Sequence, residues 1–202
     1  MQDNYKLQVE QATKTFLRYD QNRLIAKHNL AFDDDYLYTS LFSQKVRIDR
    51  RTGAMQTFQD GWEDTYRFGL NMTVMDLLCD SSDSRRASGR MQSMAAFGLQ
   101  FHSGLSEQLR SCDAEWMHSH AQRVRQNCEA LGGSLVPMGD ICYDIPVFQD
   151  LNVRMQLWFA DEEFPAKLSW FWDENALQYL HYETMYYALG YLMELITGRP
   201  ER

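Results

Sequence analysis

The chain has 202 residues, of which 45% are hydrophobic and 13% aromatic, and its formal net charge is −8 at pH 7. This composition excludes a disordered chain, and the acidic balance argues against a nucleic-acid partner, because phosphate contacts require Lys and Arg. The start of the chain lacks the basic and apolar regions of a signal peptide, and no apolar run reaches the ~18 residues that span a bilayer. We therefore expect a cytoplasmic protein without a membrane partner.

The first part of the chain predicts a helix followed by short strands. Apolar residues recur at helical spacing over residues 3–30, which predicts one helix with Asp3 as its N-cap. From residue 36 the period falls towards two, which is typical of strands up to residue 58. Gly53 stands between the last two of these strands, where we expect a hairpin turn.

The middle of the chain predicts helices separated by a polar loop. Asp60 and Glu63 have the spacing of a capping box, which predicts a helix through residues 62–78. The polar run "DSSDSRRASG" at 80–89 predicts a loop. Residues 105–131 give the clearest helical pattern, and Gly132-Gly133 would end that helix.

The last third of the chain predicts an antiparallel sheet and a helix. The strand-like segments are 134–138, 141–148, 152–160 and 167–173, and a helix follows over 183–197. The expected class is α+β: an antiparallel sheet of about four strands with packed helices, plus a small N-terminal hairpin or meander. We expect a single domain over 1–202, built from a helix and meander (1–60), a helical middle (61–132) and a sheet with the C-terminal helix (133–202).

The stretch "ADEEFP" sets Asp161, Glu162 and Glu163 beside aromatic strands. One interpretation is a carboxylate site, in which these acids converge with Asp140 or Asp173 to hold a divalent ion or to act as a general acid. The other is a solvated hairpin tip in which Asp161 accepts backbone N–H bonds and Phe164 tucks under the turn. We favour the second, because antiparallel strands commonly end in such turns.

The remaining candidates are aromatic, histidine and cysteine side chains. The aromatic candidates are Tyr143, Trp158, Trp170 and Trp172. One interpretation is that they line a pocket for a planar ligand, and the other is that they fill a core between the sheet and a helix. His118 and His120 do not share a helix face, and none of the four cysteines has metal-ligand spacing. The sequence therefore predicts no metal site and four reduced thiols, and it identifies no cofactor.

The C-terminal block carries a resemblance to a known family. It combines a Gly139-Asp140 turn, the D-E-E-F-P turn, a strand ending in Asp173 and a Glu183 that opens the last helix. Over residues 131–195 the chain resembles an uncharacterised bacterial and archaeal family, the domain of unknown function 3786. The acids of these shared features, together with the acidic turn, make up the candidate ligand or acidic site: Asp140, Asp161, Glu162, Glu163, Asp173 and Glu183. Some relatives carry an additional iron–sulfur cysteine motif, which implies a link to anaerobic metal, corrinoid or redox metabolism; this chain lacks that motif.

Three classes of function remain open at this point. The leading hypothesis is a ligand-binding or accessory protein whose site lies near the second sheet and the acidic turn. The alternatives are a carboxylate- or metal-assisted hydrolase that uses Asp140, Asp161, Glu163 and Asp173, and a structural or protein-interaction subunit. The sequence does not decide whether the protein is an enzyme, whether its partner is a small molecule or a protein, or whether it is a monomer or a homodimer. Convergent carboxylates in a pocket would favour an enzyme, and an open aromatic face would favour a protein partner.

Overall fold

The structure is a computed structural model that describes residues 2–97 and 113–199. Its contacts divide the chain into two compact units. Within the described residues, the first unit contains the chain up to Arg86 and Leu177–Met193, and the second contains Ala87–Ala176 and the residues from Glu194 onward. The expected division into one domain of three parts stays a prediction, and each unit is described below by itself.

The N-terminal segment forms two helices, α1 (Gln2–Phe16) and α2 (Gln21–His28), so the prediction of one helix over 3–30 is wrong. The physical reason is Asp20, which has extended backbone and caps α2. Its carboxylate accepts the N–H groups of Asn22 at 2.9 Å and Arg23 at 3.4 Å. These two bonds satisfy N–H groups that the first turn of a helix leaves unpaired, so a new helix starts at this point.

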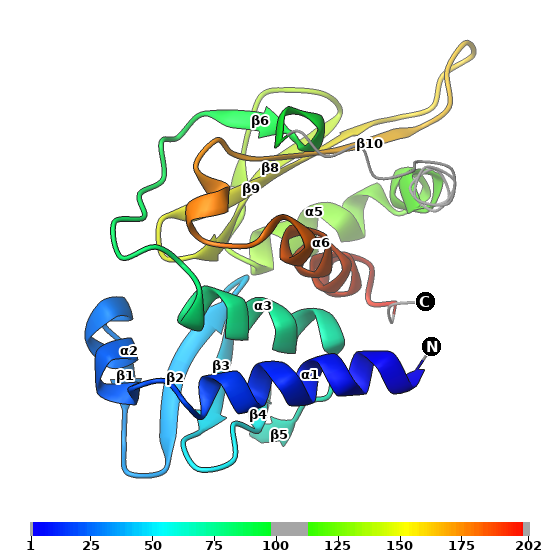
Figure 1. Cartoon of the computed structure of the whole chain (residues 1–202). Helices are drawn as coiled ribbons and strands as arrows, with labels where there is room; N and C mark the ends of the chain where they lie inside the picture. The colour runs from blue at the N-terminus through cyan, green and yellow to red at the C-terminus, as the bar shows by residue number, and fades with distance from the viewer. Residues whose placement is uncertain (1, 98–112, 200–202) are drawn as a thin grey trace. The chain divides into compact units, whose positions relative to one another are not determined.

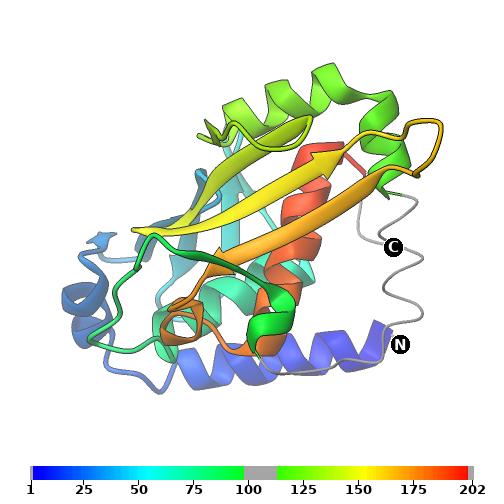
Figure 2. The same cartoon turned by 90° about the horizontal axis from the view of Figure 1, so that it is seen from above.

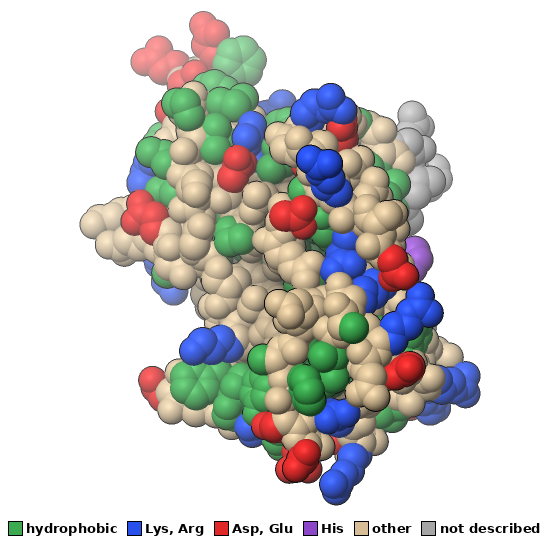
Figure 3. All heavy atoms as spheres, turned by 90° about the vertical axis from the view of Figure 1, so that its left-hand side faces the viewer, with side chains coloured by type: hydrophobic (Ala, Val, Ile, Leu, Met, Phe, Trp, Pro, Cys, Tyr) green, Lys and Arg blue, Asp and Glu red, His purple; other side chains and the backbone are tan. Residues whose placement is uncertain are grey.

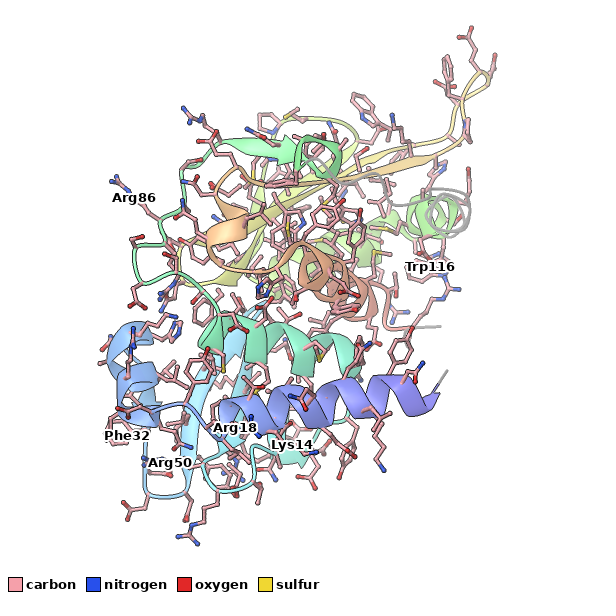
Figure 4. All side chains as sticks on the ribbon, viewed as in Figure 1. Lys14, Arg18, Phe32, Arg50, Arg86 and Trp116 are labelled. Atoms are coloured by element: carbon pink, nitrogen blue, oxygen red, sulfur yellow. The ribbon has the colours of Figure 1, made fainter. Side chains whose placement is uncertain are left out.

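The first sheet follows directly and is antiparallel in the order β1-β2-β3-β4-β5. Its strands are β1 (Ala31–Phe32), β2 (Tyr36–Leu41), β3 (Gln44–Asp49), β4 (Met55–Phe58) and β5 (Trp62–Asp64). The predicted hairpin turn is confirmed: Gly53 has φ +72°, and the Asp49 carboxylate accepts the N–H groups of Arg51 and Thr52. At the sheet's edge the Arg50 guanidinium lies 5.8 Å from the centre of the Phe32 ring (Figure 4).

Helix α3 (Phe68–Cys79) begins later than the sequence predicts. Asp60 and Glu63 do not form a capping box, because Glu63 lies in β5 opposite Thr57 of β4. The helix is buried along most of its length and lies beside α1 (Figure 1). At Gly69 a Cβ atom would approach the Tyr187 carbonyl oxygen to 2.5 Å, so only glycine lets α3 come this close to α6.

Helix α6 (Tyr182–Thr197) closes the chain, and its residues up to Met193 belong to the first unit. It is strongly apolar, and Tyr191 packs its ring 6.3 Å from that of Phe42. In the described part of the chain, neither α6 nor any other helix has the uninterrupted apolar length that a membrane span requires.

The second unit is built on an antiparallel sheet in the order β6-β10-β9-β8-β7 (Figure 2). Its strands are β6 (Met91–Ser93), β7 (Ser134–Leu135), β8 (Ile141–Phe148), β9 (Leu151–Trp158) and β10 (Lys167–Asp173), and the short 3-10 helices η1 (Met94–Phe97) and η2 (Ala176–Gln178) flank β6 and β10 along the chain. The four predicted strands are confirmed as antiparallel neighbours, and β6 adds a fifth. Two five-stranded sheets thus replace the expected sheet of about four strands with a small meander, within the same α+β class.

The helix predicted over 105–131 is interrupted. Described residues are helical at 113–119 and again in α5 (Ala121–Ala130), with His120 outside helical geometry between them, and residues 105–112 lie outside the described part. The end of α5 agrees with the prediction, because Gly132 has φ +78° and Gly133 donates its N–H to the Cys128 carbonyl. The Tyr143 hydroxyl of β8 donates to Glu129 of α5 at 2.9 Å, which joins this helix to the sheet.

One histidine of the first unit gives a stability prediction. His28 is 3% exposed, its Nε2 lies 2.9 Å from the Leu78 carbonyl, and the Arg85 guanidinium donates to its Nδ1 at 3.0 Å. Burial, and then the positive charges of Arg85 and Lys27, lower the pKa of His28 from 6.5 to about 4. The unfolded chain therefore binds more protons between these values, so stability is full above pH 6.5 and falls as the pH falls towards 4.

We expect protonation of His28 to lower the free energy of unfolding by on the order of 3 kcal/mol as the pH falls from 6.5 to about 4. Urea unfolding at a series of pH values should show a shallower loss of stability below pH 6.5 in His28→Gln than in the parent chain, although His28→Gln is less stable near neutral pH. His120→Gln serves as the control, because His120 is exposed. Equal slopes for the parent chain and His28→Gln would contradict the assignment.

Candidate functional site

The acidic hairpin, residues 158–167, joins β9 to β10 and projects beyond the rest of its sheet (Figures 1 and 2). Its turn is closed by one carboxylate: Oδ1 of Asp161 accepts the N–H groups of Glu163 and Phe164, each at 2.8 Å. These bonds, that from Phe164 first, hold the pKa of Asp161 below its usual value. The prediction that Asp161 accepts backbone N–H bonds within the turn is confirmed.

The other side chains of the turn point to a different role. The carboxylates of Glu162 and Glu163 are exposed and make no hydrogen bond or ion pair with the described residues. Phe164 is 66% exposed, so the prediction that it tucks under the turn is wrong. The physical reason is that the Asp161 hydrogen bonds close the turn without any apolar anchor, which leaves the Phe164 ring in water.

The base of the acidic hairpin is fixed by polar and aromatic contacts. Asp140 accepts the N–H of Phe159 at 2.7 Å, and Glu115 accepts the N–H of Ala166 at 3.0 Å. The His118 ring stacks on Phe159 with ring centres 4.6 Å apart. A hairpin held at its base in this way presents its tip in a defined position.

A largely apolar groove runs along this hairpin and β10. Its cavity volume is about 830 Å³, and it is lined by Ser93, Met94, Ala95, Trp158, Phe159 and residues 164–171. Trp158 is 48% exposed and Trp170 is 8% exposed. We call this feature the apolar groove.

The four aromatic candidates do not share one pocket. Trp158 and Trp170 line the apolar groove, whereas Tyr143 and Trp172 are 2% and 0% exposed and belong to the core of the second unit. Strand alternation places Trp158, opposite Lys167, on one face of the sheet, and Trp170 and Trp172, opposite Met155 and Val153, on the other. Trp170 thus shares the face of Trp172, although it also lines the apolar groove.

Asp173 lies away from the acidic hairpin and binds backbone. It is 1% exposed, and its carboxylate accepts the N–H groups of Ser88 at 2.9 Å, Gly89 at 2.7 Å and Asn175 at 2.9 Å. The segment 80–89 is the loop that the sequence predicts, and these bonds tie its end to β10. This brings the chain into position to add β6 to the sheet at Phe171–Asp173.

The six candidate acids are therefore not gathered into one cluster. Glu183 opens α6 in the first unit, where it accepts a hydrogen bond from the Tyr187 hydroxyl. Among the described residues, the group of three metal-ligating side chains whose ligand atoms converge is Asp76, Asp80 and His181, and it contains none of the six.

This cluster lies in a groove of the first unit with a volume of about 370 Å³, which we call the α3 groove. Residues of α1, of α3 and of the start of α6 line it, including Gln8, Gln11, Thr15, Cys79, Glu183 and Thr184 beside the cluster itself. Sequence reasoning missed it. The one local signal is the four-residue spacing of Asp76 and Asp80, which places both on one side of a helix.

The cysteines offer no reactive thiolate in the described chain. Cys79, Cys128 and Cys142 are free and buried, which confirms the expectation for these three, while Cys112 lies outside the described residues. Burial raises the pKa of Cys79 and of Cys128 to about 12. Both groups therefore remain protonated near neutral pH and are poor nucleophiles.

The fold and these surfaces define an α+β protein with two antiparallel sheets, one of which carries a projecting acidic hairpin. A family model described as "Domain of unknown function (DUF3786)" matches residues 20–195, so the chain belongs to this family, as the sequence resemblance indicates. Neither a curated protein nor a solved structure shows significant similarity to the chain.

The exposure of Phe164 gives a direct stability prediction. Phe164→Ala should change the free energy of unfolding by no more than about 0.5 kcal/mol, because its ring loses little contact. Phe148 of β8 is 5% exposed, so Phe148→Ala should cost about 3–5 kcal/mol. Urea unfolding of both variants checks the pair, and a large loss for Phe164→Ala would show that the ring anchors the turn.

Asp173 gives a second prediction. Asp173→Asn replaces one acceptor oxygen by an N–H₂ group that faces N–H donors, which should cost about 1–3 kcal/mol. Hydrogen exchange at the amides of Ser88 and Gly89 should become faster. Asp140→Asn is the matched control, because Asp140 is exposed and its change should leave those two amides unaffected. Unchanged exchange in Asp173→Asn would contradict the tethering role.

Proposed function

We propose that this protein is a cytoplasmic accessory protein that binds a basic, amphipathic segment of a partner protein through the acidic hairpin and the apolar groove. The observation that carries the proposal is the exposure of Trp158 and Phe164 beside that groove, with Glu162 and Glu163 at the tip of the same hairpin.

The aromatic side chains supply the apolar part of the interaction. Trp and Phe are large side chains that contribute strongly when a partner removes them from water, and Trp is among the residues most often found at the energetic centre of an interface. Phe164 is not needed to close its turn, and Trp158 lies on the outer face of its strand. Exposed aromatic surface that the fold does not require is typical of a binding surface.

The charges of the acidic hairpin favour a basic partner. Asp161, Glu162 and Glu163 are adjacent and exposed, and the whole chain is acidic, with a net charge of −8. Figure 3 shows acidic side chains together with a hydrophobic one at the projecting top of the molecule. Complementary charge raises the rate of association and selects against acidic partners, nucleic acids included.

The competing hydrolase hypothesis has weaker support. Asp140 and Asp161 each accept backbone N–H bonds that hold the hairpin, and Asp173 is buried under its own N–H donors. A general acid or base must reach the proton of a reacting group, which these bonded carboxylates do not readily do.

Two short synthetic peptides test the proposal. Both alternate Leu and Trp with charged residues, and the charged residues are Lys in one and Glu in the other. The proposal expects the Lys peptide to bind and to change amide chemical shifts at the acidic hairpin, with the Glu peptide binding far more weakly. The double variant Glu162→Lys/Glu163→Lys and the variant Phe164→Ala should each weaken binding of the Lys peptide about tenfold or more, which corresponds to about 1.4 kcal/mol.

The controls separate local recognition from general attraction to an acidic protein. Asp34→Lys/Asp60→Lys changes the net charge by the same amount at exposed positions of the first unit, and it should weaken binding less than twofold. Phe32→Ala removes an exposed Phe elsewhere and should have no effect. Equal loss in the charge control, or equal binding of the two peptides, would overturn the proposal.

A further inference from the structure

The first unit brings two carboxylates and an imidazole together. Asp76 lies in the last turn of α3, Asp80 is the residue that caps its C-terminus, and His181 directly precedes α6. One ligand atom from each residue lies within 4.8 Å of the others. Residues far apart in the sequence therefore place two oxygen donors and one nitrogen donor around a common point.

The fold holds these donors in place. Asp76 is 6% exposed, and its carboxylate accepts both the backbone N–H of His181 at 2.8 Å and a hydrogen bond from Nδ1 of the ring at 2.6 Å. These two bonds fix the imidazole ring relative to α3. Asp80 is also held, because the Tyr19 hydroxyl donates to its Oδ1 at 3.2 Å.

The surroundings favour a cation. Among the described residues that line the α3 groove, three are acidic (Asp76, Asp80 and Glu183) and none is Lys or Arg. Gln8, Gln11 and Thr15 of α1 also line this groove and carry neutral oxygen atoms. A volume of about 370 Å³ leaves room for water or a small ligand beside an ion.

We propose that Asp76, Asp80 and His181 form a binding site for a divalent first-row transition-metal ion such as Zn²⁺ or Mn²⁺. The donor set decides the class of ion: carboxylates alone suit Mg²⁺ and Ca²⁺, whereas an imidazole nitrogen favours Zn²⁺ and related ions. The site offers three protein ligands. Catalytic zinc sites also have three protein ligands and keep a fourth position for water or substrate, whereas structural sites are closed by four. The site is independent of the partner-binding role proposed for the acidic hairpin.

Binding of Zn²⁺ and Mn²⁺ to the metal-stripped full-length chain tests this site. Equilibrium dialysis with metal analysis, together with calorimetry, should give one ion per chain and weaker binding of Mg²⁺. Asp80→Asn and His181→Gln should each lower the affinity for Zn²⁺ about tenfold or more, and circular dichroism should show that both variants fold. Asp76→Asn alone is not a sufficient test, because Asp76 is buried and the amide replaces one of the two acceptor oxygens that bind His181.

Matched controls make the result decisive. Asp83→Asn and His120→Gln alter an exposed Asp and an exposed His outside the cluster, and both should bind Zn²⁺ as the parent chain does. Cys79→Ser should also retain binding, since the proposed donors are oxygen and imidazole nitrogen. The inference is overturned if no stoichiometric ion binds, if Asp80→Asn and His181→Gln bind normally, or if Cys79→Ser abolishes binding.

Discussion

Buried carboxylates that must be paired organise both units of this protein. Asp76 and Asp173 are 6% and 1% exposed, and an unpaired charge at such a position would cost several kcal/mol. Each is satisfied by backbone N–H groups from a distant segment: His181 at Asp76, and Ser88 and Gly89 at Asp173. These bonds fix the start of α6 against α3 in the first unit, and the approach of β6 to β10 in the second.

An exposed carboxylate that pairs with backbone N–H groups also explains why side chains of the acidic hairpin are not needed for folding. Asp161 closes the turn through two backbone N–H bonds, so neither Phe164 nor the two glutamates that precede it are needed to form the turn. In the first unit the pairing of Asp76 with His181 instead holds an imidazole at the wall of the α3 groove. One unit thus presents an amphipathic surface suited to a partner protein, and the other a donor set suited to a metal ion.

Local sequence patterns predicted what depends on neighbouring residues. The alternation of β9 and β10, the Gly53 turn and the bonds of Asp161 all follow from periodicity or turn chemistry within a few residues. The prediction of one long N-terminal helix is wrong at Asp20, because the N-cap there starts a second helix although the apolar pattern continues. Strand β6 and the Asp76–His181 pair could not be predicted from the sequence, because each depends on a contact between distant segments that no local pattern encodes.

The central claim is that the two units carry separate binding surfaces of different chemistry. Amide ¹H–¹⁵N spectra of the labelled chain test it most directly, in one titration with the Lys-containing peptide and in another with Zn²⁺. The account predicts that the peptide shifts amides of residues 158–171 and that Zn²⁺ shifts those of 76–80 and 181–184. Peptide shifts spread over both units, or Zn²⁺ shifts confined to the acidic hairpin or to the neighbours of Cys128 and Cys142, would contradict it.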